Sequence, residues 1–174
     1  EWSLHPAGER FRTAILVSKD GHCLDDLLAR AASGELPLDL AAVISNHPDH
    51  RPTAERFGYE FHHLSVDPDD RDEQPTRLAA VLGELDVELV ILARYMQILP
   101  AWLVDRYPNG IINIHHSFLP AFAGANPYQR AHERGVKIIG ATAHYVTAEL
   151  DEGPIISQEA TQVSHRDDVT RLVQ

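Results

Sequence analysis

The run Val87-Glu-Leu-Val-Ile-Leu-Ala93 is nearly continuously apolar. A strand with apolar side chains at almost every position has to be covered on both faces, as the central strands of parallel sheets are. The run therefore predicts a central strand in a sheet that carries helices on both sides.

Strands and helices alternate on either side of this run. Apolar stretches predict further strands at Phe11 to Ser18, Leu38 to Ser45, Phe61 to Val66 and Ile111 to His115. Helical spacing predicts helices at Cys23 to Ser33, capped by Gly34, and at Pro52 to Phe57, Gln74 to Leu85, Pro100 to Tyr107 and Tyr128 to Arg134. This alternation predicts an α/β fold with a doubly wound, mostly parallel sheet.

The pattern changes near the C-terminus. Two strands are expected at Gly140 to Thr147 and Ile155 to Val163, and the short link Asp-Glu-Gly-Pro joins them. A link of this kind suits neighbouring antiparallel strands, so we expect an antiparallel addition to the sheet.

Composition excludes several classes of partner. A chain of 174 residues is long enough for one well-buried core, and its net charge of −11 disfavours nucleic acid and anionic membrane surfaces. The single cysteine, Cys23, allows no internal disulfide, and no apolar run reaches membrane-spanning length. We expect one cytoplasmic domain that acts on a small molecule, and a homo-oligomer remains open.

The segment Gly110 to Gly124 combines with a later acidic turn to suggest chemistry. In a strand, alternate side chains share a face, so Asn113 and His115 point the same way. An amide can hold a developing oxyanion, an imidazole can move a proton, and Asp151 could orient that imidazole or a water. Taken singly, each residue is more often structural: a strand end, a satisfied core histidine and a turn residue.

Several of these segments follow predicted strands. In open α/β sheets, ligands bind beyond the carboxyl ends of the strands, where the strand order reverses. Arg94 to Leu99, His115 to Ser117 and Thr147 to Asp151 all occupy such positions. The alternative for Met96, Ile98 and Leu99 is that they are ordinary core residues.

The sequence gives little support for a metal or a bound nucleotide. The loop Ser18 to Leu24 has one glycine, whereas a dinucleotide cradle needs several. Adjacent strand residues face opposite ways, so neither His62-His63 nor His115-His116 can chelate one ion. We expect no metal and no tightly bound cofactor.

Long motifs resemble the folate-dependent formyl-transfer enzymes, and among them the formyltetrahydrofolate deformylases. The motifs are Asn113-Ile-His115 followed by Ser117, Leu119 and Pro120, then His144-Tyr-Val-Thr-Ala-Glu-Leu-Asp151-Glu-Gly-Pro-Ile-Ile, and also Leu92-Ala-Arg-Tyr-Met96 and Gly135-Val-Lys-Ile-Ile-Gly-Ala-Thr-Ala-His144. The resemblance runs from the first strand to the last residue.

The resemblance implies hydrolysis of 10-formyltetrahydrofolate to formate and tetrahydrofolate, a reaction of one-carbon metabolism linked to purine biosynthesis. It implies that Asn113, His115 and Asp151 are catalytic. It also implies that the pterin lies against two segments, largely through backbone groups. Their residues are Tyr95, Met96, Gln97, Ile98 and Leu99, and Thr147, Ala148, Glu149 and Leu150.

Two alternatives stay open. A related enzyme passes the formyl group to glycinamide ribonucleotide, but its phosphate-binding loop after the first strand corresponds here to Lys19 to Cys23, which lacks that cradle. A folate-binding module without catalysis is the other alternative. Asn126 departs from the family, which more often has a basic residue there.

The resemblance also sets the expected domain boundaries. Residues 1–10 would be a linker that follows an N-terminal regulatory domain of the amino-acid-sensing type. Residues 11–174 would be a formyltransferase-like catalytic domain, and its final helix, which begins near Ser164, would be cut short.

Overall fold

The computed structural model describes residues 8–67, 69–70, 72–122, 124, 126–169 and 172. Its internal contacts divide the chain into two compact units, Glu1–Gly110 and Ile111–Gln174. The single domain, the N-terminal linker and the shortened last helix stay predictions, and the linker and that helix fall partly outside the described residues.

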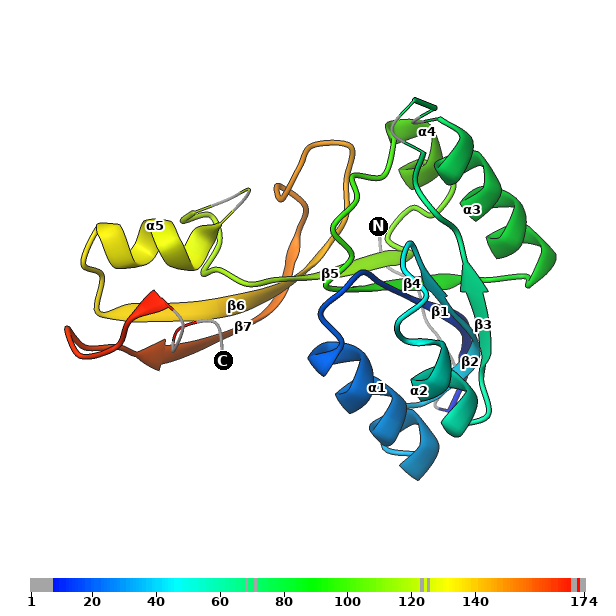
Figure 1. The fold of residues 1–174 in the computed structure, drawn as a ribbon, viewed down its shortest axis with the longest axis horizontal. Coiled ribbons are helices and arrows are strands. Elements are labelled where there is room, and N and C mark those ends of the chain that lie inside the picture. Colours follow the sequence, from blue (N-terminus) through cyan, green and yellow to red (C-terminus); the bar gives the residue numbers. More distant parts are fainter. Residues whose placement is uncertain are drawn as a thin grey trace. The chain divides into compact units, whose positions relative to one another are not determined.

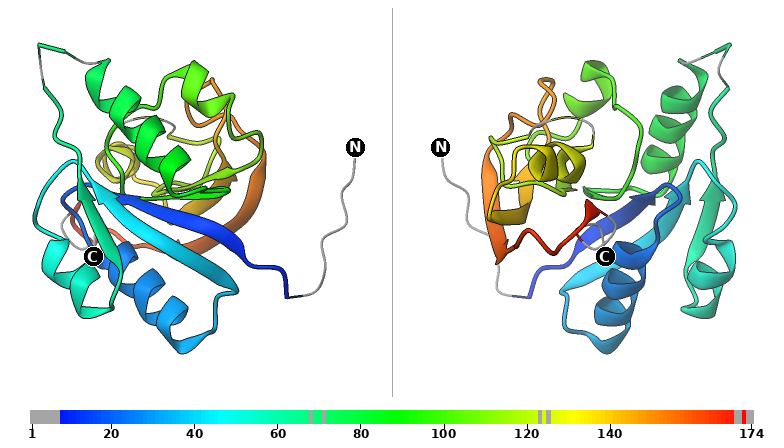
Figure 2. Two further views of the ribbon diagram at one scale, coloured as in Figure 1. Left: turned by 90° about the vertical axis from the view of Figure 1, so that its right-hand side faces the viewer. Right: turned by 60° about the vertical axis from the view of Figure 1, so that its left-hand side comes forward.

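The first unit is a parallel sheet between helices (Figure 1). Its strands lie in the order β3-β2-β1-β4. The elements are β1 (Phe11–Val17), α1 (His22–Ser33), β2 (Leu38–Ser45), α2 (Arg51–Arg56), β3 (Glu60–His63), α3 (Glu73–Glu84), β4 (Leu89–Ala93) and α4 (Ala101–Val104). Helices α1 and α2 lie on one face of these strands and α3 lies on the other (Figure 2).

The first strand shows why the sheet has to be covered twice. Ile15 and Val17 belong to the apolar cluster that includes Leu24 and Leu28 of α1. The alternate residues of β1, such as Leu16, are fully buried as well. Since successive strand residues face opposite sides, both faces of β1 are shielded from water, as the continuous apolar pattern predicts.

The second unit is an antiparallel sheet that packs against a helix (Figure 1). Its strands lie in the order β5-β6-β7, and its elements are β5 (Ile111–His115), α5 (Pro127–Glu133), β6 (Ile138–Tyr145) and β7 (Ile155–Gln162). A small apolar cluster joins Ala131 of α5, Ile139 of β6 and Leu172. The helix is therefore fixed to the sheet by burial of its apolar side.

The expected fold class is confirmed. Pairing is parallel throughout the first unit, with helices on both faces, and the strands near the C-terminus pair antiparallel. The Gly34 cap is also confirmed: its φ of 79° lies in the left-handed region, and its N–H donates to the Ala31 carbonyl oxygen at 3.2 Å.

Three elements are shorter than predicted by two residues or more, each for a reason in the backbone. Strand β3 ends at His63 because β2, its partner, ends at Ser45, and the last bond runs from Leu64 N to the Ser45 carbonyl. Strand β4 begins at Leu89 and not at Val87. The Val87 N–H donates to the Leu82 carbonyl of α3 and so does not take part in the sheet.

Helix α4 ends at Val104 rather than at Tyr107. After that residue, the N–H groups of Arg106 and Tyr107 donate to carbonyls three residues back, at 3.2 and 3.0 Å. Bonds of this spacing form turns and not α-helix, and Pro108 disfavours helical backbone at the residue before it.

Two glycines of the first unit allow a matched test of backbone conformation. Gly83 lies near the end of α3 with open space around it, so Gly83→Ala should raise the free energy of unfolding by roughly 0.5 to 1 kcal/mol. Gly34→Ala should lower it by about 1 kcal/mol, because an added side chain is strained at positive φ. Denaturant unfolding of both variants measures the difference, and equal signs would contradict the assigned conformations.

Candidate active site

The register between β5 and β6 places four polar side chains on one face. Asn113 lies opposite His144, and His115 lies opposite Thr142. Directly opposed residues of an antiparallel pair project on the same side, and residues two apart along a strand do so as well. The expected common face of Asn113 and His115 is therefore present, and β6 adds a histidine and a threonine to it.

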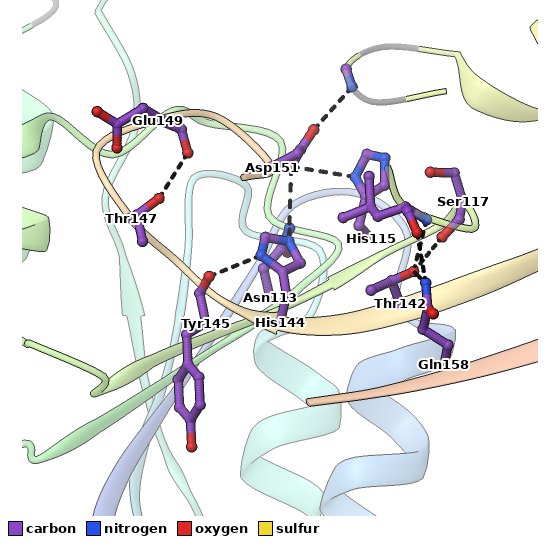
Figure 3. Close-up of polar contacts among 12 residues, drawn as sticks. Asn113, His115, Ser117, Thr142, His144, Tyr145, Thr147, Glu149, Asp151 and Gln158 are labelled. Atoms are coloured by element: carbon purple, nitrogen blue, oxygen red, sulfur yellow. Dashed lines mark hydrogen bonds and ion pairs between the residues drawn. The ribbon is translucent and has the colours of Figure 1, made fainter. Parts of the chain in front are cut away.

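Asp151 faces both histidines of this group (Figure 3). Its Oδ1 lies 3.5 Å from Nδ1 of His115 and 3.9 Å from Nε2 of His144. The side chains of His115 and Asp151 are only 7% and 6% exposed. A carboxylate and two imidazoles that share a nearly dry space interact more strongly than they would in water.

Backbone conformation and contacts with two other segments hold the loop that carries Asp151. Asp151 has a φ of 59°, in the left-handed region that aspartate tolerates better than most residues. Its Oδ2 accepts a hydrogen bond of 2.9 Å from the N–H of Gly124. Gly153 is buried where any Cβ would run into the Tyr145 carbonyl oxygen, so only glycine lets the loop close this tightly on β6.

A second network fixes the turn that follows His115 (Figure 3). The fully buried Thr142 hydroxyl donates to the Ser117 carbonyl at 2.8 Å and accepts from the Leu119 N–H at 3.0 Å. Gln158 Nε2 of β7 donates to both the Leu119 carbonyl and the Thr142 hydroxyl. These hydrogen bonds tie the turn to β6 and β7, and they fix the direction in which the chain leaves β5.

The predicted residues of the first unit lie at the carboxyl edge of its sheet. Ser18 follows β1, and its hydroxyl donates to Asn46 Oδ1 at 2.7 Å and accepts from the Met96 N–H at 2.9 Å. The order β3-β2-β1-β4 reverses between β1 and β4, which is where ligands of open sheets bind. Tyr95 to Leu99 thus start at the switch point of this unit.

The side chains of this segment divide into two kinds. Tyr95 is buried, its hydroxyl accepts from Gln74 Nε2 at 2.6 Å, and burial raises its pKa to about 12. Met96 and Ile98 are 55% and 77% exposed, so their interpretation as core residues is wrong. Exposed apolar side chains next to a switch point suit a ligand surface.

The other predicted residues lie at the surface of the second unit. Ala148, Glu149 and Leu150 are exposed, while Thr147 is half-buried and its hydroxyl donates to the Glu149 carbonyl at 3.1 Å. Asn126, the departure from the family, caps α5 with a φ of 52°. Asparagine adopts this backbone readily, so the substitution suits its position.

Sequence reasoning missed the contributions of His144, Thr142 and Gln158 to this site. The signal was present for the first two, since Thr142 and His144 are two apart in a predicted strand and share a face. Gln158 and the Gly124 N–H carried no such signal, because their contacts depend on long-range register. Among the described residues, no three His, Cys, Asp or Glu side chains are placed to hold a metal ion.

Comparison with known proteins finds relatives over most of the chain. The formyl transferase family matches residues 11–174. The chain is 55% identical over 172 residues to a formyltetrahydrofolate deformylase of Synechocystis, with 99% of this chain and 60% of the relative covered. It is 53% identical over 171 residues to the Bacillus subtilis enzyme of the same name, covering 98% and 57%. The chain thus spans about three fifths of the length of these relatives.

Solved structures are similar over nearly the whole chain. A formyltetrahydrofolate deformylase from Pseudomonas syringae has a TM-score of 0.92 at 49% identity, with 95% of this chain and 55% of that chain covered. A glycinamide ribonucleotide transformylase from Symbiobacterium toebii has a TM-score of 0.89 at 38% identity, covering 99% and 82%. On the match of residues 11–174, the chain belongs to the formyl transferase family.

Proposed function

We propose that the protein hydrolyses 10-formyltetrahydrofolate to formate and tetrahydrofolate, and that residues 11–174 form its catalytic domain. One observation carries the proposal: the buried Asp151 carboxylate lies 3.5 Å from His115 Nδ1, beside a strand face that also presents Asn113. Relatives at 55% and 53% identity, named formyltetrahydrofolate deformylases, support it.

In the proposed mechanism, Asn113, His115 and Asp151 are the catalytic residues. Water attacks the formyl carbon, and the amide of Asn113 and the imidazole of His115 stabilise the oxygen as it gains negative charge. Asp151 positions the water and takes its proton, directly or through His115. The bond from the formyl carbon to the folate nitrogen then breaks, and that nitrogen receives a proton as tetrahydrofolate leaves.

The single cysteine of the sequence, Cys23, is a poor candidate for a nucleophile, which favours attack by water. Cys23 is half-buried, and burial raises the pKa of its thiol above the ordinary value. A thiol with a raised pKa stays protonated near neutral pH and is a poor nucleophile. A covalent formyl-cysteine intermediate is therefore disfavoured.

We propose on the resemblance that two segments bind the folate. They are Tyr95, Met96, Gln97, Ile98 and Leu99, and Thr147, Ala148, Glu149 and Leu150. The buried, hydrogen-bonded Tyr95 hydroxyl supports binding through backbone groups, because that side chain is already occupied by Gln74. Exposed Met96 and Ile98 offer apolar surface that the flat rings of a folate could cover.

The loop after β1 favours water over a phosphorylated amine as the acceptor. His50 packs against Gly21 so closely that a Cβ there would meet its ring, and His50 Nε2 lies 3.0 Å from the Lys19 carbonyl. Asp20 Oδ2 adds a negative charge paired with Arg94 at 2.6 Å. The loop and its neighbour His50 thus present an imidazole and a carboxylate, whereas a phosphate is bound by free N–H groups and positive charge. His22, in contrast, is exposed.

We also propose a cytoplasmic location and a folate as the small-molecule partner. Within the part of the chain that the structure describes, no helix combines the length and apolar content that a membrane crossing needs. A net charge of −11 leaves nucleic acid a poor partner. The oligomeric state stays open, and sedimentation of the full-length protein would measure it.

The first test of function is formate release. The full-length protein mixed with 10-formyltetrahydrofolate in buffer without any amine should release formate and tetrahydrofolate in equal amounts, because water is the proposed acceptor. A formate assay coupled with tetrahydrofolate absorbance measures both products. Turnover only after addition of an amine nucleotide would establish the transferase alternative instead.

The second test concerns Asp151. Asp151→Asn keeps the shape and the acceptor for the Gly124 N–H but removes the base, so kcat should fall roughly 100-fold or more with little change in unfolding free energy. Glu152→Gln, which neutralises the exposed neighbour, is the matched control and should leave kcat within about twofold. Unchanged turnover in the Asp151 variant would contradict the catalytic assignment, and folate binding without turnover in the wild type would indicate a binding module.

A further inference from the structure

His144 contacts Asn113 across the two strands. The residues are directly opposed in the β5–β6 register, and Asn113 Nδ2 lies 3.2 Å from His144 Nε2 (Figure 3). The His144 side chain is only 2% exposed, so water does not compete for this nitrogen. The amide that the proposed function aims at the formyl oxygen therefore has a fixed neighbour.

The second ring nitrogen of His144 decides which tautomer is present. Its Nδ1 lies 2.9 Å from the Tyr145 carbonyl oxygen, which can only accept a hydrogen bond. Nδ1 must therefore carry the proton, and in a neutral imidazole Nε2 then has a lone pair and no hydrogen. The nearest Asp151 oxygen is 3.9 Å from Nε2, beyond hydrogen-bond length, so Asn113 is the partner that Nε2 bonds.

This tautomer fixes the orientation of the Asn113 amide. Only the NH2 group can donate to a lone pair, so the amide must turn its nitrogen, and not its oxygen, toward His144. One amide hydrogen is used by Nε2, and the other stays available to the oxygen of a bound formyl group. A flipped amide would turn its oxygen toward the Nε2 lone pair and toward the developing oxyanion. Both contacts would be repulsive, because all three groups carry negative charge density.

We propose that His144 is a positioning residue that locks the Asn113 amide in its donor orientation, through the tautomer that the Tyr145 carbonyl selects. The proposal rests on the proposed function, since it assumes that Asn113 stabilises the oxyanion. In this proposal the effect of His144 on the reaction passes through Asn113, and His144 touches no reacting atom.

Two variants with amide side chains separate the roles of the two ring nitrogens of His144. His144→Gln places an amide oxygen near the position of Nε2 and keeps the acceptor for Asn113, whereas His144→Asn keeps only a donor near the position of Nδ1. Because oxyanion donors act in the transition state, His144→Asn should lower kcat about 10- to 100-fold with KM nearly unchanged. His144→Gln should keep at least about tenfold more kcat than His144→Asn. Equal kcat values in equally stable variants would overturn the proposal.

A double-mutant cycle tests whether His144 works through Asn113. In an Asn113→Ala background, His144→Asn should cause no further loss of kcat, because the amide that it orients is gone. A loss as large as in the wild-type background would show that His144 acts independently and would overturn the proposal. Urea unfolding of all four proteins separates a catalytic effect from a loss of fold.

Nitrogen-15 NMR of the full-length protein tests the lock without any turnover. At the pH of the activity assay, His144 should show a protonated Nδ1 and an unprotonated Nε2. A protonated Nε2 would overturn the proposal even if formate is released. If the wild type releases no formate while the expected tautomer is present, the proposed function fails, but the orientation of the Asn113 amide by His144 is supported.

Discussion

The candidate active site depends on the register between β5 and β6. That register puts Asn113 opposite His144 and His115 opposite Thr142, so that one face carries an amide, two imidazoles and a hydroxyl. Because side chains alternate along a strand, a slip of one residue would turn one strand's members of this set to the opposite face. The Thr142 and Gln158 hydrogen bonds to the turn after β5 hold the pairing in place.

The carboxylate reaches this face from a loop with an unusual backbone. Asp151 is held in the left-handed region, its Oδ2 is bonded by the Gly124 N–H, and Gly153 lets the loop press onto Tyr145. A buried carboxylate is costly unless its oxygens find partners, and here one oxygen has a backbone donor while the other faces two histidines. Strain and burial of this kind concentrate at functional sites.

Much of the fold was predictable because local pattern and tertiary environment agree. The apolar run predicts β4, and the helical spacing together with the Gly34 cap predicts α1 and its end. Two of the errors fall where a neighbouring element decides the outcome: β3 ends because β2 ends, and the Val87 N–H is bonded to α3 before β4 starts.

The candidate site was predictable in part for the same reason. Alternation along one strand suffices to put Asn113 and His115 together, and the family motif adds Asp151. Sequence periodicity could not show the Gly124 bond or the role of Gln158, since each depends on contacts between residues 16 or more positions apart. His144 lay within reach of the argument, because it shares a face with Thr142, but its partner depends on the β5–β6 register.

The most direct measurement is a crystal structure of the full-length protein with a non-hydrolysable analogue of 10-formyltetrahydrofolate. The account predicts the formyl oxygen within about 3 Å of Asn113 Nδ2 and an ordered water between Asp151 and the formyl carbon. A formyl group bound away from Asn113, His115 and Asp151, or a site with no room for that water, would contradict it.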